Sequence, residues 1–131
     1  MEIHHKDNTN FSLIKRAKSF THAFRGLGIL FKSTHNAWIH IVVFVIVVLF
    51  GKVFHITHLE WALVLLAAGF VFSAEAFNTA IEIDIDLTSP QYHPCARDTK
   101  DVAAGAVLIA TITAVLIGIC VFGPYMLSFI P

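Results

Sequence analysis

The sequence predicts an all-α membrane protein with an N-terminal amphipathic surface helix and three transmembrane helices. The 131 residues are 56% hydrophobic and only 14% charged, whereas typical soluble domains are about 45–50% apolar and about 25% charged. Long apolar stretches follow a more polar N-terminal region. Because the basic residues equal the acidic residues in number, no excess of positive charge favours a nucleic acid partner.

The N-terminal region divides into a tail and a helix. Residues 1–10 are polar and are expected to form a disordered tail, and residues 11–131 a single domain. Within 11–32, apolar side chains recur at helical spacing among lysines and arginines, which predicts an amphipathic helix on the membrane surface. The first long apolar run starts only near Ile39, so no secretory signal peptide is expected.

Three apolar stretches are long enough to cross a bilayer, which requires about 20 residues of helix. They predict transmembrane helices at about residues 36–54, 59–83 and 102–125. Trp61, just after the turn between the first two, suits an interfacial anchor. Residues 84–101 are polar and rich in proline and charge, and they are expected to form a loop.

Basic residues favour one orientation of these helices. The predicted crossings place one group on the side of the N-terminus: Lys15, Arg16, Lys18, Arg25, Lys32, Arg97 and Lys100. Only Lys52 lies on the opposite side. Since cytoplasmic loops carry an excess of lysine and arginine, the N-terminus is predicted to be cytoplasmic.

Four polar residues interrupt or follow the second apolar stretch, namely Glu75, Asn78, Glu82 and Asp86. At about 100° per residue they fall on one side of a helix and form a polar stripe. A carboxylate in a bilayer costs at least about 2.5–3.5 kcal/mol and is kept where it faces protein, water or a cation. The stripe is therefore predicted to line a site, the alternative being a polar seam that only joins helices. Since one stripe per chain needs cover from lipid, a homo-oligomer is expected.

The polar stripe and the pair Lys100–Asp101 favour phosphoryl transfer. Carboxylates bind Mg²⁺ through a few ligands, while water and phosphate oxygens complete the coordination. A lysine offsets phosphate charge, and a positioned acid accepts a hydroxyl proton. ATP and a lipid alcohol are the expected substrates. A small ion-conducting or purely structural bundle is the competing class, although Lys100–Asp101 has no obvious role in a pore.

Two motifs resemble the signature of the small prokaryotic diacylglycerol kinase and undecaprenol kinase family. They are Glu75-x-x-Asn78-Thr79-Ala80-Ile81-Glu82-x-x-x-Asp86 and Lys100-Asp101-x-Ala103-Ala104, within a resemblance that covers about residues 14–122. The resemblance implies a homotrimer in the inner (cytoplasmic) membrane of a prokaryote. It also implies that ATP and Mg²⁺ are used to phosphorylate diacylglycerol or undecaprenol, at a site between subunits on the cytoplasmic side.

The resemblance also implies roles for individual residues. Glu75 is the candidate base, with Asn78 supporting it as a catalytic residue, and Glu82 binds the metal. The residues implied to contact or approach the nucleotide are Lys15, His22, Glu82, Asp86, His93, Lys100 and Asp101.

Two positions depart from the family pattern. Thr34 stands where the family usually has a glutamate that helps to bind the metal; its hydroxyl ligates weakly or holds a metal-bound water, without a negative charge. His22 occupies a position where tyrosine is common. The alternative function is therefore a catalytically impaired family member that binds nucleotide or lipid without efficient turnover.

The lipid acceptor stays open between diacylglycerol and undecaprenol. Asn36, Ile39 and His40 form an N-x-x-I-H pattern that resembles the undecaprenol kinase branch. A plain interfacial role for His40 is an equal alternative.

Overall fold

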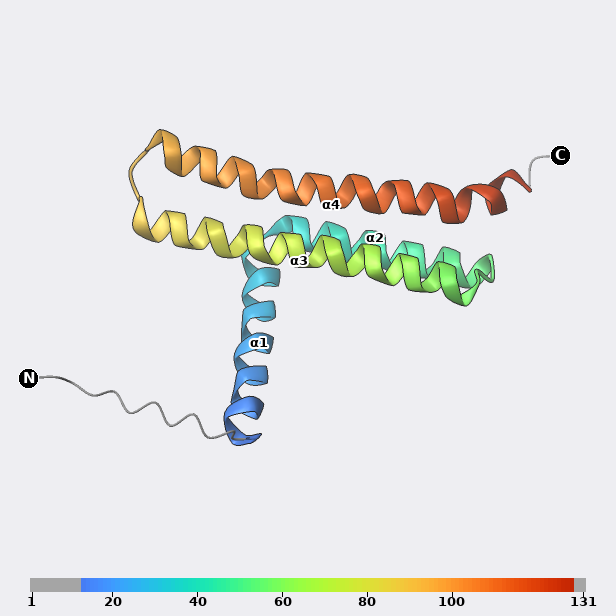
Figure 1. Ribbon diagram of the computed structural model, residues 1–131, viewed down its shortest axis with the longest axis horizontal. Coiled ribbons are helices and arrows are strands. Elements are labelled where there is room, and N and C mark those ends of the chain that lie inside the picture. Colours follow the sequence, from blue (N-terminus) through green and yellow to red (C-terminus); the bar gives the residue numbers. More distant parts are fainter. Residues whose placement is uncertain (1–12, 129–131) are drawn as a thin grey trace, which may run out of the picture.

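The computed structural model describes residues 13–128 and consists of four helices joined by short connections (Figure 1). The helices are α1 (Leu13–Ser33), α2 (His35–Val53), α3 (His58–Thr88) and α4 (Pro94–Leu127). Among the described residues, α2, α3 and α4 are long and apolar enough to cross a membrane. The prediction of an all-α membrane protein is confirmed.

Helix α1 stands roughly perpendicular to the other three helices (Figure 1). The elbow between α1 and α2 is built from local hydrogen bonds. Thr34 is extended and caps α2, because its hydroxyl accepts from the N–H of Ala37 at 3.4 Å and donates to the carbonyl of Leu30 at 3.4 Å. The Trp38 indole N–H donates to the carbonyl of Phe31 at 2.8 Å. When the other helices cross a bilayer, α1 therefore runs along its surface.

The three most exposed large apolar side chains described in α1 lie on one face. Leu13, Phe20 and Phe24 are 74%, 68% and 69% exposed, and their spacing of seven and four residues places them together. Lys18 and Arg25 lie on a different side of the helix. This arrangement suits a helix that buries its apolar face in the membrane interface.

Residues 54–57 join α2 to α3 at what we call the turn end of the bundle. Thr57 and Glu60 form a capping box that starts α3. The Tyr125 hydroxyl from α4 donates to the Glu60 carboxylate at 2.8 Å, and the Tyr125 ring stacks on Phe54 with centroids 5.8 Å apart. These contacts tie the last turns of α4 to the connection between α2 and α3.

The opposite end of the bundle, where α1 meets α2, is called the elbow end, and α3 and α4 project beyond it (Figure 1). Helix α2 has 19 residues, whereas α3 has 31 and α4 has 34. At 1.5 Å per residue, α3 and α4 are about 46 and 51 Å long, against about 30 Å for the hydrocarbon core. We call their projecting ends, residues 84–101, the α3–α4 tip.

The expected loop over residues 84–101 is wrong for most of its length. Helix α3 continues to Thr88 and α4 begins at Pro94, so only residues 89–93 separate them. The expectation placed the helix ends where hydrophobicity falls. The actual helix ends are set by the two prolines, because Pro90 cannot continue α3 and Pro94 suits the first turn of α4. An ion pair between Lys100 and Asp86 then joins the two helices across the tip.

The bundle of one chain has a small core. Ile56, Val64 and Val121 form its buried cluster near the turn end. Large side chains on the same helices remain exposed, including Leu66 at 69% and Ile109 at 64%. These surfaces suit contact with lipid or with another transmembrane helix.

Candidate functional site

The buried polar side chains of the described residues gather on the second half of α3. Glu75, Asn78 and Thr79 are 1%, 6% and 4% exposed. Their spacing of three and four residues places them on one face of the helix. The buried polar surface therefore coincides with the start of the stripe predicted from the sequence.

Contacts with α2 place this face at the elbow end. The ring of His40 on α2 lies 6.4 Å from the ring of Phe72 on α3. Glu75 follows Phe72 by almost one turn, and Ala37, which is fully buried, precedes His40 by almost one turn in the antiparallel helix. Glu75 therefore lies at the level of the first turn of α2, close to the elbow.

The Glu75 side chain has no hydrogen-bond partner in the part of the chain that the structure describes. Both carboxylate oxygens are buried, and neither contacts a donor among the described residues. Its backbone carbonyl, by contrast, accepts a hydrogen bond from the Thr79 hydroxyl at 2.9 Å. A buried carboxylate without a partner is costly, so it requires a proton, a cation or a substrate group. This is the strongest indication of a ligand in the described chain.

Asn78 connects Glu75's face to Glu82. The Asn78 amide N–H donates to Glu82 Oε1 at 2.9 Å, whereas the Asn78 carbonyl oxygen is buried without a partner among the described residues. Glu82 is half-buried. The amide thus orients one carboxylate oxygen of Glu82 and leaves its own oxygen free to accept a hydrogen bond.

A second group of predicted residues lies at the α3–α4 tip. The Lys100 ammonium pairs with the Asp86 carboxylate across the two helices. His93 caps α4, since its Nδ1 accepts from the Cys95 N–H at 3.2 Å. Asp101, at 73% side-chain exposure, pairs with Arg97, with 3.9 Å between Nε and Oδ2. The tip is therefore a water-exposed network of opposite charges.

Arg97 also belongs to this charged network, although the sequence-based prediction named it only as a basic residue on the side of the N-terminus. His93, Arg97, Lys100 and Asp101 are spaced i, i+4, i+7 and i+8, so they follow one face of α4. Arg97 and Lys100 are also the only lysine or arginine residues after Lys52. The spacing and the scarcity of basic residues are both visible in the sequence. They indicate a shared face only when α4 is known to begin at Pro94.

The predicted residues of α1 stay apart from both groups within one chain. His22 is exposed on α1, which leaves the bundle near the start of α2 and runs away from it (Figure 1). Lys15 belongs to the same helix, but its side chain lies outside the described part of the structure. A single chain therefore does not bring α1 and the α3–α4 tip together.

Thr34 lies at the elbow and uses most of its hydrogen-bonding capacity there. A hydroxyl has one donor and two acceptor lone pairs, and the cap occupies the donor and one lone pair. No group of three or more His, Cys, Asp or Glu residues in the described chain could hold a metal on its own. The donor set fits Mg²⁺, which is commonly bound by one or two carboxylates together with substrate phosphates and water.

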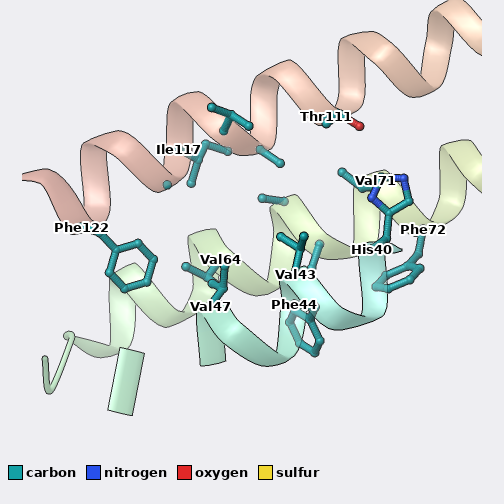
Figure 2. Close-up of a pocket in the computed structure, with 15 residues that line it drawn as sticks. His40, Val43, Phe44, Val47, Val64, Val71, Phe72, Thr111, Ile117 and Phe122 are labelled. Atoms are coloured by element: carbon teal, nitrogen blue, oxygen red, sulfur yellow. The ribbon is translucent and has the colours of Figure 1, made fainter. Parts of the chain in front are cut away.

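An apolar groove of about 210 Å³ runs between α2 and α4 over α3 (Figure 2). His40 and Phe72 lie at one end and Phe122 at the other, and Thr111 faces it from α4 (Figure 2). The His40 end lies about one turn from Glu75. The groove can therefore hold an apolar chain that begins beside the polar stripe.

The chain is similar to one known protein family and to several individual proteins. A family model described as prokaryotic diacylglycerol kinase matches residues 21–122. Undecaprenol kinase of Bacillus subtilis is 36% identical over 119 residues, which cover 91% of this chain and 96% of that protein. A diacylglycerol kinase of Synechocystis sp. is 39% identical over 111 residues, covering 84% of this chain and 63% of that protein. A diacylglycerol kinase of Helicobacter pylori is 32% identical over 127 residues, covering 92% and 96%.

Proposed function

The chain belongs to the prokaryotic diacylglycerol kinase family, and from this premise we propose that it transfers the γ-phosphate of ATP to the hydroxyl of a membrane lipid alcohol with Mg²⁺ as cofactor. It is a lipid kinase by family, and its three apolar helices make it a membrane protein. The further proposals concern the residues, the cofactor, the acceptor and the assembly.

The single observation that carries the proposal is the buried, unpartnered carboxylate of Glu75. A lipid hydroxyl placed against it would give the carboxylate a hydrogen-bond donor. Glu75 then accepts the hydroxyl proton as the lipid oxygen bonds to the γ-phosphorus and the bond to the β-phosphate oxygen breaks. The products are the phosphorylated lipid and ADP.

Asn78 and Glu82 form the part of the site nearest the phosphates. The 2.9 Å hydrogen bond from Asn78 fixes one oxygen of Glu82, and the free carbonyl oxygen of Asn78 faces the same stripe. Glu82 would hold Mg²⁺, and Thr34 retains one lone pair for a metal-bound water. When bound, Mg²⁺ neutralises phosphate charge.

The nucleotide is proposed to bind at the α3–α4 tip. Lys100 offsets phosphate charge after exchanging its partner Asp86 for the nucleotide, and Asp101 and His93 line the same face of α4. His22 and Lys15 lie on α1, away from this tip within one chain. Their participation requires a second subunit, so we propose an oligomer with the site between subunits on the cytoplasmic side, and the family resemblance implies that this oligomer is a homotrimer.

The acceptor is a lipid whose hydroxyl reaches Glu75 while its tail lies in the membrane. The curated relatives carry the names of two such enzymes, undecaprenol kinase and diacylglycerol kinase. The apolar groove beside His40 is compatible with either tail. We therefore propose one of these two acceptors.

The test is phosphate transfer in mixed micelles with MgATP, comparing diacylglycerol with undecaprenol. We expect transfer to one of them, and a loss of about 100-fold or more in Glu75→Gln and in Glu82→Gln. The matched control is Asp84→Asn, an exposed acid between the stripe positions, which should stay active. Full activity in both Glu75→Gln and Glu82→Gln would contradict the proposal.

One observation favours the alternative of an impaired member that binds without efficient turnover. The Thr34 hydroxyl is engaged in capping α2 and brings no negative charge to the elbow. In that case the protein retains nucleotide or lipid but transfers phosphate to neither acceptor. Equilibrium binding of ATP in the same micelles separates this outcome from a protein that binds nothing.

A further inference from the structure

The first turns of α4 place Arg97 between two residues assigned to the nucleotide. At about 100° per residue, Arg97 lies between Lys100 and Asp101 around the helix axis and one turn closer to the α3–α4 connection. Helical side chains lean towards the N-terminus of their helix, so Lys100 and Asp101 both lean towards Arg97. A ligand that contacts both of them from one side therefore covers Arg97.

The surroundings of Arg97 leave it able to change partners. Its guanidinium contacts Asp98 at 3.2 Å and Asp101 at 3.9 Å, with the Arg97 side chain 60% exposed. Exposed ion pairs of this kind are weak. An incoming phosphate can therefore replace a carboxylate without opening any packed structure.

The charge balance at the tip makes each cation there significant. The acids of the tip are Asp84, Asp86, Asp98 and Asp101, with Glu82 just before it, against the two cations Arg97 and Lys100. A polyphosphate that approaches this end meets more negative than positive side chains. Lys100 alone leaves most of that repulsion in place, so a second cation at the contact surface favours binding.

We infer that Arg97 binds the phosphates of the nucleotide as a second cation beside Lys100, an inference that rests on the proposed function. The planar guanidinium can bind two phosphate oxygens at once. Binding releases Asp98 and Asp101 from Arg97, so Asp101 becomes free for its own contact with the ligand. No covalent step is involved.

The experiment measures MgATP binding to the full-length protein in lipid nanodiscs by titration calorimetry, with KM values for ATP and for the lipid. Arg97→Gln should weaken ATP binding and raise the KM for ATP about tenfold while the KM for the lipid stays unchanged. Arg97→Lys should recover part of the loss, because lysine keeps the positive charge but lacks the planar guanidinium that binds two oxygens at once. Lys52→Gln, at the turn end, is the matched control and should bind ATP like the parent protein.

Two further binding measurements test whether Arg97 itself contacts the phosphates. Adenosine binding should be unaffected by Arg97→Gln, because adenosine carries no phosphate. In an Asp101→Asn background, Arg97→Gln should still weaken ATP binding. Loss of that effect would mean that Arg97 only positions Asp101, which overturns the inference.

The failure of this inference is distinguishable from failure of the proposed function. A parent protein that phosphorylates lipid, with unchanged ATP binding in Arg97→Gln, overturns the role of Arg97 alone. A parent protein that neither binds ATP nor phosphorylates either lipid overturns both.

Discussion

Two of the three glutamates of helix α3, Glu60 and Glu75, have opposite surroundings. At the turn end, Glu60 Oε2 accepts hydrogen bonds from the Thr57 N–H, the Thr57 hydroxyl and the Tyr125 hydroxyl, at 2.7, 2.8 and 2.8 Å. At the elbow end, Glu75 is 1% exposed, and neither carboxylate oxygen has a donor among the described residues. Among the described residues, the same side chain on the same helix thus accepts three hydrogen bonds at one end and none at the other.

This difference separates a structural end of the bundle from a functional one. Hydrogen bonds to a charged group stabilise a fold, whereas a buried polar group without a partner destabilises it. The turn end uses its acid to hold α4 to the start of α3 and to the connection between α2 and α3. At the elbow end, we propose that the cost of the buried acid is offset when a ligand binds.

The largest expected effect is an opposite change in stability for the two glutamates. Glu60→Gln weakens three hydrogen bonds to a carboxylate and should lower the free energy of unfolding by about 1–3 kcal/mol. Glu75→Gln replaces a buried carboxyl group that has no partner among the described residues, and it should leave that free energy unchanged or higher. Thermal unfolding in detergent, without nucleotide or metal, measures both. An equal loss of stability in the two variants would remove the distinction between the two ends.

The next largest change in stability is expected where side chains pack closely at the turn end. A Cβ added at Gly51 would lie 2.7 Å from the Trp61 ring and 3.1 Å from Ile56 Cδ1, and the ring belongs to a packed cluster. Gly51→Ala should therefore destabilise the protein by about 1–3 kcal/mol, despite the better helix propensity of alanine. Gly26→Ala is the matched control, because nothing lies within 4 Å of its added Cβ. A Gly51→Ala variant as stable as its control would show that the turn end tolerates repacking.

A carboxylate introduced at the elbow end tests whether Thr34 limits metal binding. Thr34→Glu adds a carboxylate near the stripe, so the Mg²⁺ concentration for half-maximal activity should fall about tenfold. The same change removes a threonine cap and should lower stability by about 0.5–2 kcal/mol. Metal titration and thermal unfolding of one preparation measure the two effects. Unchanged Mg²⁺ dependence would mean that the site functions with the threonine and would count against the impaired alternative.

The sequence was sufficient to predict the fold class and the polar stripe. Apolar stretches long enough for a bilayer predicted the helices, and the spacing of Glu75, Asn78 and Glu82 predicted one face. The burial of Glu75 follows from its closeness to the first turn of α2, which depends on the α2–α3 packing. Sequence periodicity contains no information on that contact.

The α3–α4 tip was the least predictable part of the site. Hydrophobicity ends before α3 does, so the continuation of the helix through Asp86 was missed. The pairing of Lys100 with Asp86 and of Arg97 with Asp101 depends on where α4 begins. The Thr34 cap and the Asn78–Glu82 hydrogen bond were also beyond the sequence, because a polar side chain at helical spacing has several possible partners.

The smallest expected effect isolates one contact of the structural end. Tyr125→Phe removes the hydroxyl that donates to Glu60 but keeps the ring that stacks on Phe54. Glu60 retains both hydrogen bonds from Thr57, so the loss of stability should be about 0.5–1.5 kcal/mol. Lipid phosphorylation should stay at the parent level, because the turn end lies at the far side of the bundle from Glu75. If activity fell while stability held, the turn end would have to be coupled to the site, and the division of α3 into a structural and a functional half would fail.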